Sequence, residues 1–476
     1  MTENLSQTMR RIRRIHFIGI GGAGMSGIAE VLHNLGYAVS GSDLKRSAVV
    51  QRLISLGINI TIGHKEKNSS RADVVVVSTA IDPENPEVKA AHARHIPVIP
   101  RAQMLSELMR FRYGITVAGT HGKTTSTSLL ATIFAEAGLK PTFVVGGKVN
   151  SAGANARLGE GPYFIAEADE SDASFLHLTP MVTVVTNIDA DHMHTYHNDF
   201  SELRNTFLRF IQRLPFYGLA VVCVDDPNIQ TLLPNITCSL ITYGFNEEAD
   251  VRAINFFQNG LQSEFTVLYG KKHNKSFKVK LNLAGAHNVK NALAAIAVSL
   301  DCGIQISNIK KALLKFAGVG RRCQQYGDIT VKSKTIKLID DYGHHPEEIR
   351  VTYQALKEAF PGRRVILIFQ PHRYSRTQEL FDDFAEVLSK VDLLLLFDVY
   401  TAGETPIPSV DSKALSRSIR QRGKIDPIYV KDVEGALDVI PDVIKDGDIL
   451  LTQGAGDVDQ TLIKLIKMTQ KKTKRK

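Results

Sequence analysis

A glycine-rich turn between an apolar strand and a helix occurs twice in this sequence of 476 residues. The first turn, at residues 19–24 (GIGGAG), follows the apolar residues 15–18. The second, at residues 119–125 (GTHGKTT), follows residues 114–118 and leads into a helical pattern that stops at Gly138. Because strand, tight turn and helix in this order form a βα unit, both turns predict parallel sheets with helices on their faces.

The rest of the chain continues this alternation. After about residue 318, apolar strands at 336–339, 364–369, 393–397 and 449–452 alternate with helical patterns. A chain of this length exceeds one hydrophobic core, so several domains are expected. The predicted fold is α/β with three domains: an N-terminal Rossmann-like domain, a central P-loop ATPase-type domain and a C-terminal Rossmann-like domain. The predicted boundaries are 1–106, 107–317, 318–466 and a disordered basic tail at 467–476.

Composition excludes several classes of protein. Hydrophobic residues make up 43% and charged residues 22% of the chain, which is ordinary for a globular enzyme. Apolar runs are too short to span a bilayer, and no signal-peptide core precedes the first strand, so we expect a cytoplasmic protein without membrane insertion. The four cysteines are scattered, which favours reduced thiols over disulfides or a zinc site.

The net charge of +9 does not by itself predict nucleic-acid binding. Much of the excess lies in two terminal runs, at residues 10–14 and 467–476. Terminal basic runs are usually solvated, and no basic surface interleaved with aromatic residues is visible. We therefore expect no nucleic-acid partner.

The first glycine turn fits the pattern G-x-G-x-x-G, with Asp43 at a suitable distance downstream. Glycines allow the backbone to approach a diphosphate at the amino end of a helix. The pattern alone does not distinguish NAD from another diphosphate ligand, and a tight turn without any ligand is the simplest alternative.

The second turn is more specific. Lys123 and Thr124 follow Gly122 where the strand gives way to the helix, so backbone N–H groups, an ammonium and a hydroxyl meet there. These groups bind the phosphates of ATP and its Mg²⁺. The turn departs from the common spacing, because Val117 stands where that pattern has its first glycine. ATP is the predicted ligand.

Acidic residues follow the next two strands, in residues 167–172 (EADESD) and 187–192 (NIDADH). Loops at the carboxyl ends of parallel strands line the ligand crevice, where Mg²⁺ would offset their repulsion. Solvated loop acids that cap helices are the alternative. Three nearby histidines suggest zinc, but the many oxygen ligands favour a hard cation; these histidines are His192, His194 and His197.

Two loops of the third domain, at residues 340–346 (DDYGHHP) and 370–376 (QPHRYSR), follow strands and should open onto one crevice. Arg373 and Arg376 are suited to hold a carboxylate or phosphate. The alternative is that they pair with surface acids. A further anion-friendly loop lies at 454–457.

In this order, the motifs resemble those of the Mur ligase family over nearly the whole chain. The matching segments are HFIGIGGAGMSG (16–27), GTHGKTT (119–125), EADESDASFL (167–176), NIDADHMHTY (187–196), HNVKNAL (287–293), DDYGHHP (340–346), FQPHRYSRT (369–377), YTAGETP (400–406) and GAGD (454–457). Three positions depart from the family pattern: His194 replaces an acid, Cys323 an aromatic residue and Ala286 a basic residue. His194 lies in the segment 187–196, where the metal-binding His192 is expected, so this replacement bears on the geometry expected there.

The resemblance implies ligation of L-alanine to the lactyl carboxylate of UDP-N-acetylmuramate through an acyl phosphate, with ADP and phosphate as products. The enzyme would serve cytoplasmic peptidoglycan synthesis as a monomer or homodimer. Residues expected at the UDP-sugar are Gly19, Gly21, Gly22, Gly24, Ser42, Asp43, His64 and Ser78. Those expected at ATP are Gly119, Thr120, His121, Gly122, Lys123, Thr124, Thr125, His287, Asn288, Asn291 and Arg321, with Mg²⁺ on Thr124, Glu167 and His192. Those expected at alanine and the reacting carboxylate are Tyr342, His344, Arg373 and Arg376, and the catalytic set is Lys123, Glu167, His192, His344 and Arg373.

Rival functions remain open. A sibling ligase could add another amino acid or a whole peptide. A ligase of the folate-polyglutamate type shares the phosphate loop but would lack the first domain. An NAD-dependent oxidoreductase and a non-catalytic nucleotide-binding module are the alternatives from other classes.

Overall fold

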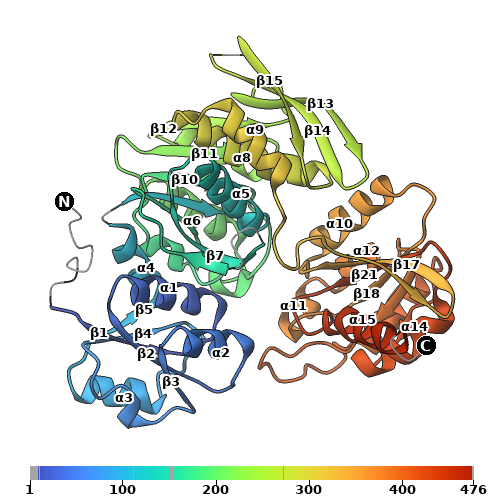
Figure 1. Ribbon diagram of the computed structural model, residues 1–476, viewed down its shortest axis with the longest axis horizontal. Helices are drawn as coiled ribbons and strands as arrows, with labels where there is room; N and C mark the ends of the chain where they lie inside the picture. The colour runs from blue at the N-terminus through green and yellow to red at the C-terminus, as the bar shows by residue number, and fades with distance from the viewer. Residues whose placement is uncertain (1–8, 10, 111, 151–153, 272, 474–476) are drawn as a thin grey trace. The chain divides into compact units, whose positions relative to one another are not determined.

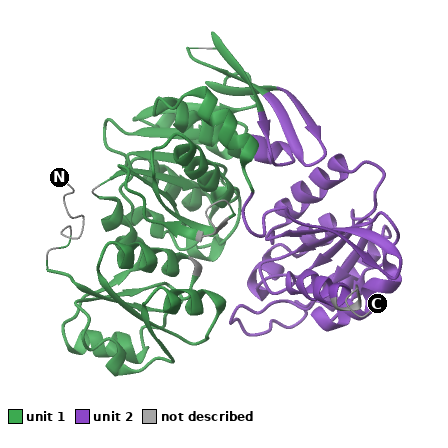
Figure 2. Ribbon diagram, in the orientation of Figure 1, with its two compact units in different colours: residues 1–254, 266–279, 290–317 green, residues 255–265, 280–289, 318–476 purple. Residues whose placement is uncertain are grey.

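The computed structural model describes residues 9, 11–110, 112–150, 154–271 and 273–473. Its strands form three sheets flanked by helices, which confirms the predicted three-domain α/β fold (Figure 1). The chain forms two compact units (Figure 2). Unit 1 comprises residues 1–254, 266–279 and 290–317, and unit 2 comprises residues 255–265, 280–289 and 318–476.

The first sheet is parallel, with strand order β3-β2-β1-β4-β5. Its centre is apolar, because β1 buries four successive residues and β4 contributes three buried valines. The strands are β1 (Arg14–Ile18), β2 (Ala38–Asp43), β3 (Asn59–Ile62), β4 (Val74–Val77) and β5 (Val98–Pro100). The helices are α1 (Ala23–Asn34), α2 (Ala48–Ser55), α3 (Pro86–Ala93) and α4 (Arg101–Met109).

The second sheet has the order β15-β14-β13-β12-β11-β10-β6-β9-β7-β8, with parallel pairing from β12 through β10, β6 and β9 to β7. Its strands are β6 (Tyr113–Ala118), β7 (Thr142–Val149), β8 (Ala154–Arg157), β9 (Tyr163–Glu167), β10 (Val182–Val185), β11 (Leu219–Cys223), β12 (Ser239–Gly244), β13 (Val251–Asn259), β14 (Gln262–Tyr269) and β15 (Lys275–Leu281). Its helices are α5 (Lys123–Glu136), α6 (Phe200–Ile211), α7 (Pro227–Leu232), α8 (Ala286–Asp301) and α9 (Ile306–Lys315).

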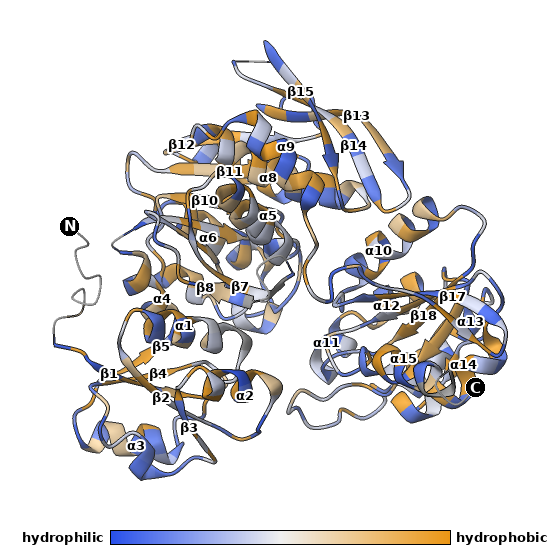
Figure 3. Ribbon diagram, viewed as in Figure 1, coloured by the Kyte–Doolittle hydropathy of each residue, from blue (hydrophilic) through white to orange (hydrophobic). Residues whose placement is uncertain are grey.

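The third sheet has the order β16-β17-β21-β18-β19-β20, and only the β16–β17 pair is antiparallel. All five residues of β18 are buried, and this strand is coloured as hydrophobic in Figure 3. The strands are β16 (Gln324–Val331), β17 (Lys334–Asp341), β18 (Val365–Phe369), β19 (Leu393–Leu396), β20 (Ile428–Tyr429) and β21 (Ile449–Gln453). The helices are α10 (Pro346–Ala359), α11 (Tyr374–Glu379), α12 (Phe381–Leu388), α13 (Ser412–Gln421), α14 (Val433–Val443) and α15 (Gln460–Thr473).

The C-terminal segment differs from the sequence-based prediction. Residues 467–473 belong to α15, whereas we predicted a disordered tail from residue 467. Leu462 and Leu465 are buried, so α15 packs on the third domain through one face and its regular hydrogen bonding continues into the basic run. Residues 474–476 lie outside the described residues.

Two features of composition have structural counterparts. The four cysteines are present as free thiols. In the described part of the chain, the helices are too short or too polar for any of them to cross a bilayer.

Helix α1 connects the first two sheets of unit 1. A Cβ atom built on Gly27 would lie 3.1 Å from the Ala156 side chain and 3.2 Å from that of Val144, so the helix packs closely on β7 and β8. The Asn155 side-chain amide also donates a hydrogen bond to Ser26 Oγ over 3.3 Å. The helix that follows the first glycine turn is therefore packed directly against the central sheet.

Candidate active site

The first glycine turn is held against the end of β2. Gly19 has a φ of +74°, and its N–H and that of Ile20 donate to the Ser42 carbonyl over 2.8 and 3.0 Å. The Gly21 N–H donates to Asp43 Oδ2 over 2.9 Å, and a Cβ on Gly21 would lie 2.8 Å from that oxygen. Glycine is required here because the turn and strand approach so closely.

The predicted UDP-sugar residues thus gather at one edge of the first sheet. Ser42 and Asp43 end β2, and Ser78 follows β4. Both oxygens of Asp43 accept backbone N–H groups, so this side chain fixes the turn. Ser42 Oγ lies 3.0 Å from His64 Nδ1, which places His64 beside the same turn. Gly22 and Gly24 flank the amino end of α1.

Arg101 is a site residue that the sequence reasoning missed. A Cβ on Gly24 would lie 2.5 Å from Arg101 Nη1, and Arg101 Nη2 donates to Asp169 Oδ2 over 2.9 Å. Thr79 Oγ1 makes a second connection, to Asp172 Oδ2 over 3.1 Å. Arg101 directly follows β5. Loops at the carboxyl ends of parallel strands line the ligand crevice, so the reasoning that identified the other loops could also have identified Arg101. These contacts join the glycine turn to the acidic loop.

The phosphate loop is braced by the loop after β10. Gly119 has a φ of +130°, and a Cβ there would lie 2.0 Å from Thr186 Oγ1. The His121 N–H donates to Asn187 Oδ1 over 2.8 Å, and the Asp189 N–H donates to Thr120 Oγ1 over 2.9 Å. Helix α5 then begins at Lys123, so its first N–H groups face the loop, as an anion site requires. Thr124 and Thr125 are the next two residues of this helix.

Lys123 turns back over this loop. Its Nζ donates to the Gly119 carbonyl over 2.6 Å, to the Thr120 carbonyl over 3.0 Å and to Glu170 Oε1 over 2.7 Å. The charge of Glu170 raises the pKa of Lys123, although burial opposes this. Burial raises the pKa of Glu170 to about 7 despite the attraction of Lys123. A charged ammonium is therefore held at the phosphate loop.

Around Lys123, the chemistry of the acidic loop fits a divalent cation. Glu170 contacts the ammonium, and the charges of Asp169 and Glu167 also act on it. Glu170 Oε2 is buried without a hydrogen-bond partner among the described residues. Buried carboxylates are costly unless cations balance them, and oxygen ligands suit Mg²⁺. Glu167 is the last residue of β9, whereas we predicted it just after the strand, and its carboxylate lies 2.8 Å from a Cβ built on Gly146.

The loop that contains His192 is fixed to the acidic loop. Thr195 Oγ1 donates to the Ser171 carbonyl over 2.7 Å, and the buried Tyr196 hydroxyl donates to the Glu170 carbonyl. His192 has a φ of +54°, and its Nε2 lies 3.5 Å from Asp191 Oδ2. The His194 side chain, which departs from the family pattern, is exposed with its ring 6.2 Å from that of His192. The structure thus holds the loop that contains His192 against the acidic loop.

Three of the residues predicted at ATP, His287, Asn288 and Asn291, lie in the first two turns of helix α8. A Cβ on Gly122 would lie 2.4 Å from Asn291 Oδ1, which accepts a hydrogen bond from Ser126 Oγ over 3.2 Å. Asn291 is thus in direct contact with the phosphate loop. Asn288 donates to the Ala284 carbonyl over 2.8 Å and so caps the turn before the helix, next to His287.

Arg321, the remaining residue predicted at ATP, is engaged within unit 2. Its Nε donates to Asp340 Oδ2 over 3.2 Å, and its Nη atoms donate to the carbonyls of Gly454 and Gly456 over 2.6 and 2.9 Å. Its guanidinium also lies 5.1 Å from the centre of the Tyr342 ring. Burial raises the pKa of Asp340 to about 6, although Arg321 opposes this. Arg321 therefore organises the loops that follow β17 and β21.

The two predicted loops of the third domain do meet, as expected. The rings of His344 and His372 lie 5.8 Å apart, and His372 stacks on Tyr400 at 5.5 Å. Arg376 is only 5% exposed and donates to the His372 carbonyl over 3.3 Å. Arg373 has a φ of +72° and directly precedes α11, and its side chain is half-buried. The two arginines therefore differ in their access to a ligand.

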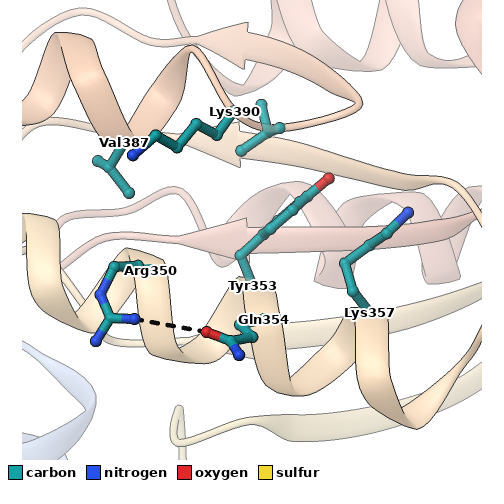
Figure 4. A pocket seen from close by; sticks show the side chains of 7 residues that line it. Arg350, Tyr353, Gln354, Lys357, Val387 and Lys390 are labelled. Carbon is teal, nitrogen blue, oxygen red and sulfur yellow. Dashed lines mark hydrogen bonds between the residues drawn. The ribbon is translucent and has the colours of Figure 1, made fainter.

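A cavity of about 250 Å³ lies elsewhere in unit 2, between α10 and α12 (Figure 4). None of the predicted site residues line it. Its basic side chains are paired with acids: Arg350 with Glu347, Lys357 with Asp392, and Lys390 with Glu386. The cavity is therefore not assigned to the predicted chemistry.

Comparison with known proteins agrees with this geometry. Family models described as the Mur ligase family catalytic domain, the Mur ligase middle domain and the Mur ligase glutamate ligase domain match residues 14–113, 117–299 and 321–456. The chain belongs to the Mur ligase family. It is accordingly an ATP-dependent, amide-forming ligase of peptidoglycan precursor synthesis, and ligases of this family generally use Mg²⁺ with ATP.

Solved Mur ligases share its fold. UDP-N-acetylmuramate-alanine ligase MurC from Thermotoga maritima is 28% identical with a TM-score of 0.82, over 96% of this chain and 99% of that one. A ligase for UDP-N-acetylmuramate and L-alanyl-gamma-D-glutamyl-meso-diaminopimelate from Neisseria meningitides is 31% identical with a TM-score of 0.59, over 65% and 100%. MurF from Acinetobacter baumannii shares the fold at 17% identity and a TM-score of 0.63, over 98% of each chain.

Proposed function

We propose that this Mur ligase joins L-alanine to the lactyl carboxylate of UDP-N-acetylmuramate in the cytoplasmic synthesis of peptidoglycan precursors. The observation that carries the proposal is the ammonium of Lys123, held at the phosphate loop in contact with Glu170. The choice of alanine is supported by the similarity to the Thermotoga maritima ligase along nearly the whole of both chains.

An amide does not form readily from a carboxylate and an ammonium ion in neutral water, so the carboxylate must first be activated. The lactyl carboxylate oxygen attacks the γ-phosphorus of ATP, and the bond from that phosphorus to the bridging oxygen breaks, which gives an acyl phosphate and ADP. Lys123 exchanges its contacts with the loop carbonyls for the γ-phosphate and stabilises the charge that develops there. Thr124, Glu167 and His192 would hold a Mg²⁺ ion, which would supply further positive charge when bound.

The second step belongs to the loops of the third domain. The amine of L-alanine attacks the acyl carbon, and phosphate leaves as the amide forms. Arg373 is the more accessible of the two arginines and binds the carboxylate of alanine, whereas the buried Arg376 supports His372 and the loop. His344, whose Nδ1 lies 3.1 Å from the Tyr342 carbonyl, orients or deprotonates the amine.

The test measures ADP formation with each substrate omitted in turn. It is then repeated with other amino acids, and with the tripeptide L-alanyl-gamma-D-glutamyl-meso-diaminopimelate, in place of alanine. We expect turnover only with ATP, UDP-N-acetylmuramate and L-alanine together. Lys123→Ala should abolish it while UDP-N-acetylmuramate binding persists. Lys140→Ala, at a lysine that is 66% exposed and paired with Glu160, is the matched control and should keep full activity. Equal ATP turnover without the sugar nucleotide or alanine would refute the proposal.

A further inference from the structure

Glu87, in the first turn of α3, is a buried carboxylate that the proposed chemistry does not use. Its side chain is fully buried. Donors from three separate segments of the first domain converge on it: β1, β2 and residues 64–68. They are His16 Nε2 at 2.7 Å, Ser42 Oγ at 2.9 Å, Asn68 Nδ2 at 2.8 Å, His64 Nδ1 at 3.3 Å and the Lys65 N–H at 3.2 Å.

These donors keep Glu87 ionised. Burial alone would raise its pKa, but the hydrogen bonds from His16 and Asn68 outweigh burial and lower it. A buried anion is tolerated when several donors satisfy its oxygens. The carboxylate is therefore a fixed negative charge at the centre of the first domain.

Two of the five donors lie beside the first glycine turn, where the sugar nucleotide is predicted to bind. The Ser42 carbonyl accepts the N–H groups of Gly19 and Ile20, so Ser42 backs directly onto the glycine turn. His64 is the only partner of Glu87 described here whose side chain is both next to Ser42 and partly exposed, at 13%. The network thus connects a buried charge to the edge of the ligand site.

The hydrogen-bond directions fix the orientation of the His64 ring. The Ser42 hydroxyl donates its proton to Glu87 Oε2, so its oxygen is left to accept. His64 Nδ1 lies 3.0 Å from that oxygen and 3.3 Å from Glu87 Oε1, and both are acceptors. Nδ1 therefore carries the proton. Among the described residues His64 has no polar contact at Nε2, so this atom is available to a ligand.

We propose that Glu87 is a positioning residue that, through Ser42 and His64, presents His64 Nε2 as a hydrogen-bond acceptor to the sugar nucleotide. The inference rests on the proposed function, because it assumes that this ligand binds at the glycine turn. In the tautomer that Ser42 and Glu87 fix, Nε2 carries a lone pair and accepts a hydrogen bond from a hydroxyl or amide N–H group of the sugar nucleotide. Glu87 itself does not touch the substrate.

The experiment compares Glu87→Gln with the wild type by calorimetric titration with UDP-N-acetylmuramate and by steady-state kinetics. We expect the dissociation constant and the KM for this ligand to rise by up to about tenfold, the size of one hydrogen bond. The kcat and the KM values for ATP and L-alanine should stay within about twofold. Glu30→Gln is the matched control, since Glu30 is a buried acid of the same domain that pairs with Arg52 over 2.7 Å.

A double-mutant cycle separates positioning from a merely structural role. If Glu87 acts through His64, Glu87→Gln should hardly change the dissociation constant for UDP-N-acetylmuramate in a protein that already carries His64→Ala. An undiminished effect there, or unchanged binding by Glu87→Gln alone, would overturn the inference while leaving the proposed function intact. Should Glu87→Gln not fold, Ser42→Ala tests the same route and must weaken binding only when His64 is present. A wild-type protein that binds no UDP-N-acetylmuramate would overturn both proposals.

Discussion

Replacement of Gly119 by alanine tests the geometry of the phosphate loop most directly. A Cβ there would lie 2.0 Å from Thr186 Oγ1 and 3.0 Å from the Thr186 backbone nitrogen, which cannot move without shifting β10. The φ of +130° adds backbone strain. Strain costs about 1–3 kcal/mol, and overpacking costs about 1–3 kcal/mol more. We expect Gly119→Ala to lose about 2–6 kcal/mol of unfolding free energy.

The matched control is Gly138→Ala, at the other end of the same helix. Gly138 has a φ of +76°, but a Cβ there would meet nothing within 4 Å, so only the strain applies. The chain has no tryptophan, so urea unfolding is followed by circular dichroism, together with ATP binding. Gly119→Ala should unfold at lower urea than Gly138→Ala and bind ATP more weakly. Equal losses in both variants would show that the close approach to Thr186 does not constrain the loop.

Two further changes test other contacts. Arg101→Met removes the guanidinium between the glycine turn and Asp169, so the KM for UDP-N-acetylmuramate should rise about tenfold, the equivalent of a charge-assisted hydrogen bond. The control is Arg110→Met, at an exposed arginine just past the end of α4. Equal KM values in the two variants would contradict a role of Arg101 in binding the sugar nucleotide. Asp73→Asn tests an ion pair with Arg14 that lowers the pKa of Asp73 to about 2. Because the folded-state pKa lies below the unfolded value, the stabilisation of about 1 kcal/mol is present above about pH 4 and lost towards pH 2, so urea midpoints of variant and wild type should converge there.

The sequence allowed the parallel sheets and their loops to be predicted, because an apolar strand followed by a glycine turn and a helix is typical of a βα unit. The loops at Lys123, Glu167 and His192 could be located by this rule, and the structure brings them together. The three outer strands β13, β14 and β15 were not predicted, since one face of each is polar and no site motif marks them.

Long-range partners could not be predicted in the same way. Glu87 lies in a short helix with little apolar periodicity, and its role depends on donors that are 19 to 71 residues away in the chain. Arg376, which we predicted to bind a ligand, is buried and donates to the His372 carbonyl, and its spacing from Arg373 did not reveal this difference in exposure. Spacing along the chain identifies residue types suited to a ligand but does not show which of them the fold leaves accessible.

The packing of α1 on β7 and β8 restricts how such an enzyme can be recombined. A Cβ on Gly27 would lie unusually close to Ala156 and Val144, so a side chain on this helix requires a compensating shift in that hairpin. A chimera that exchanges residues 1–106 between relatives would separate the two halves of this contact. Exchange after Ala317 keeps both halves from one parent, so crossover at that point should give the more stable hybrids.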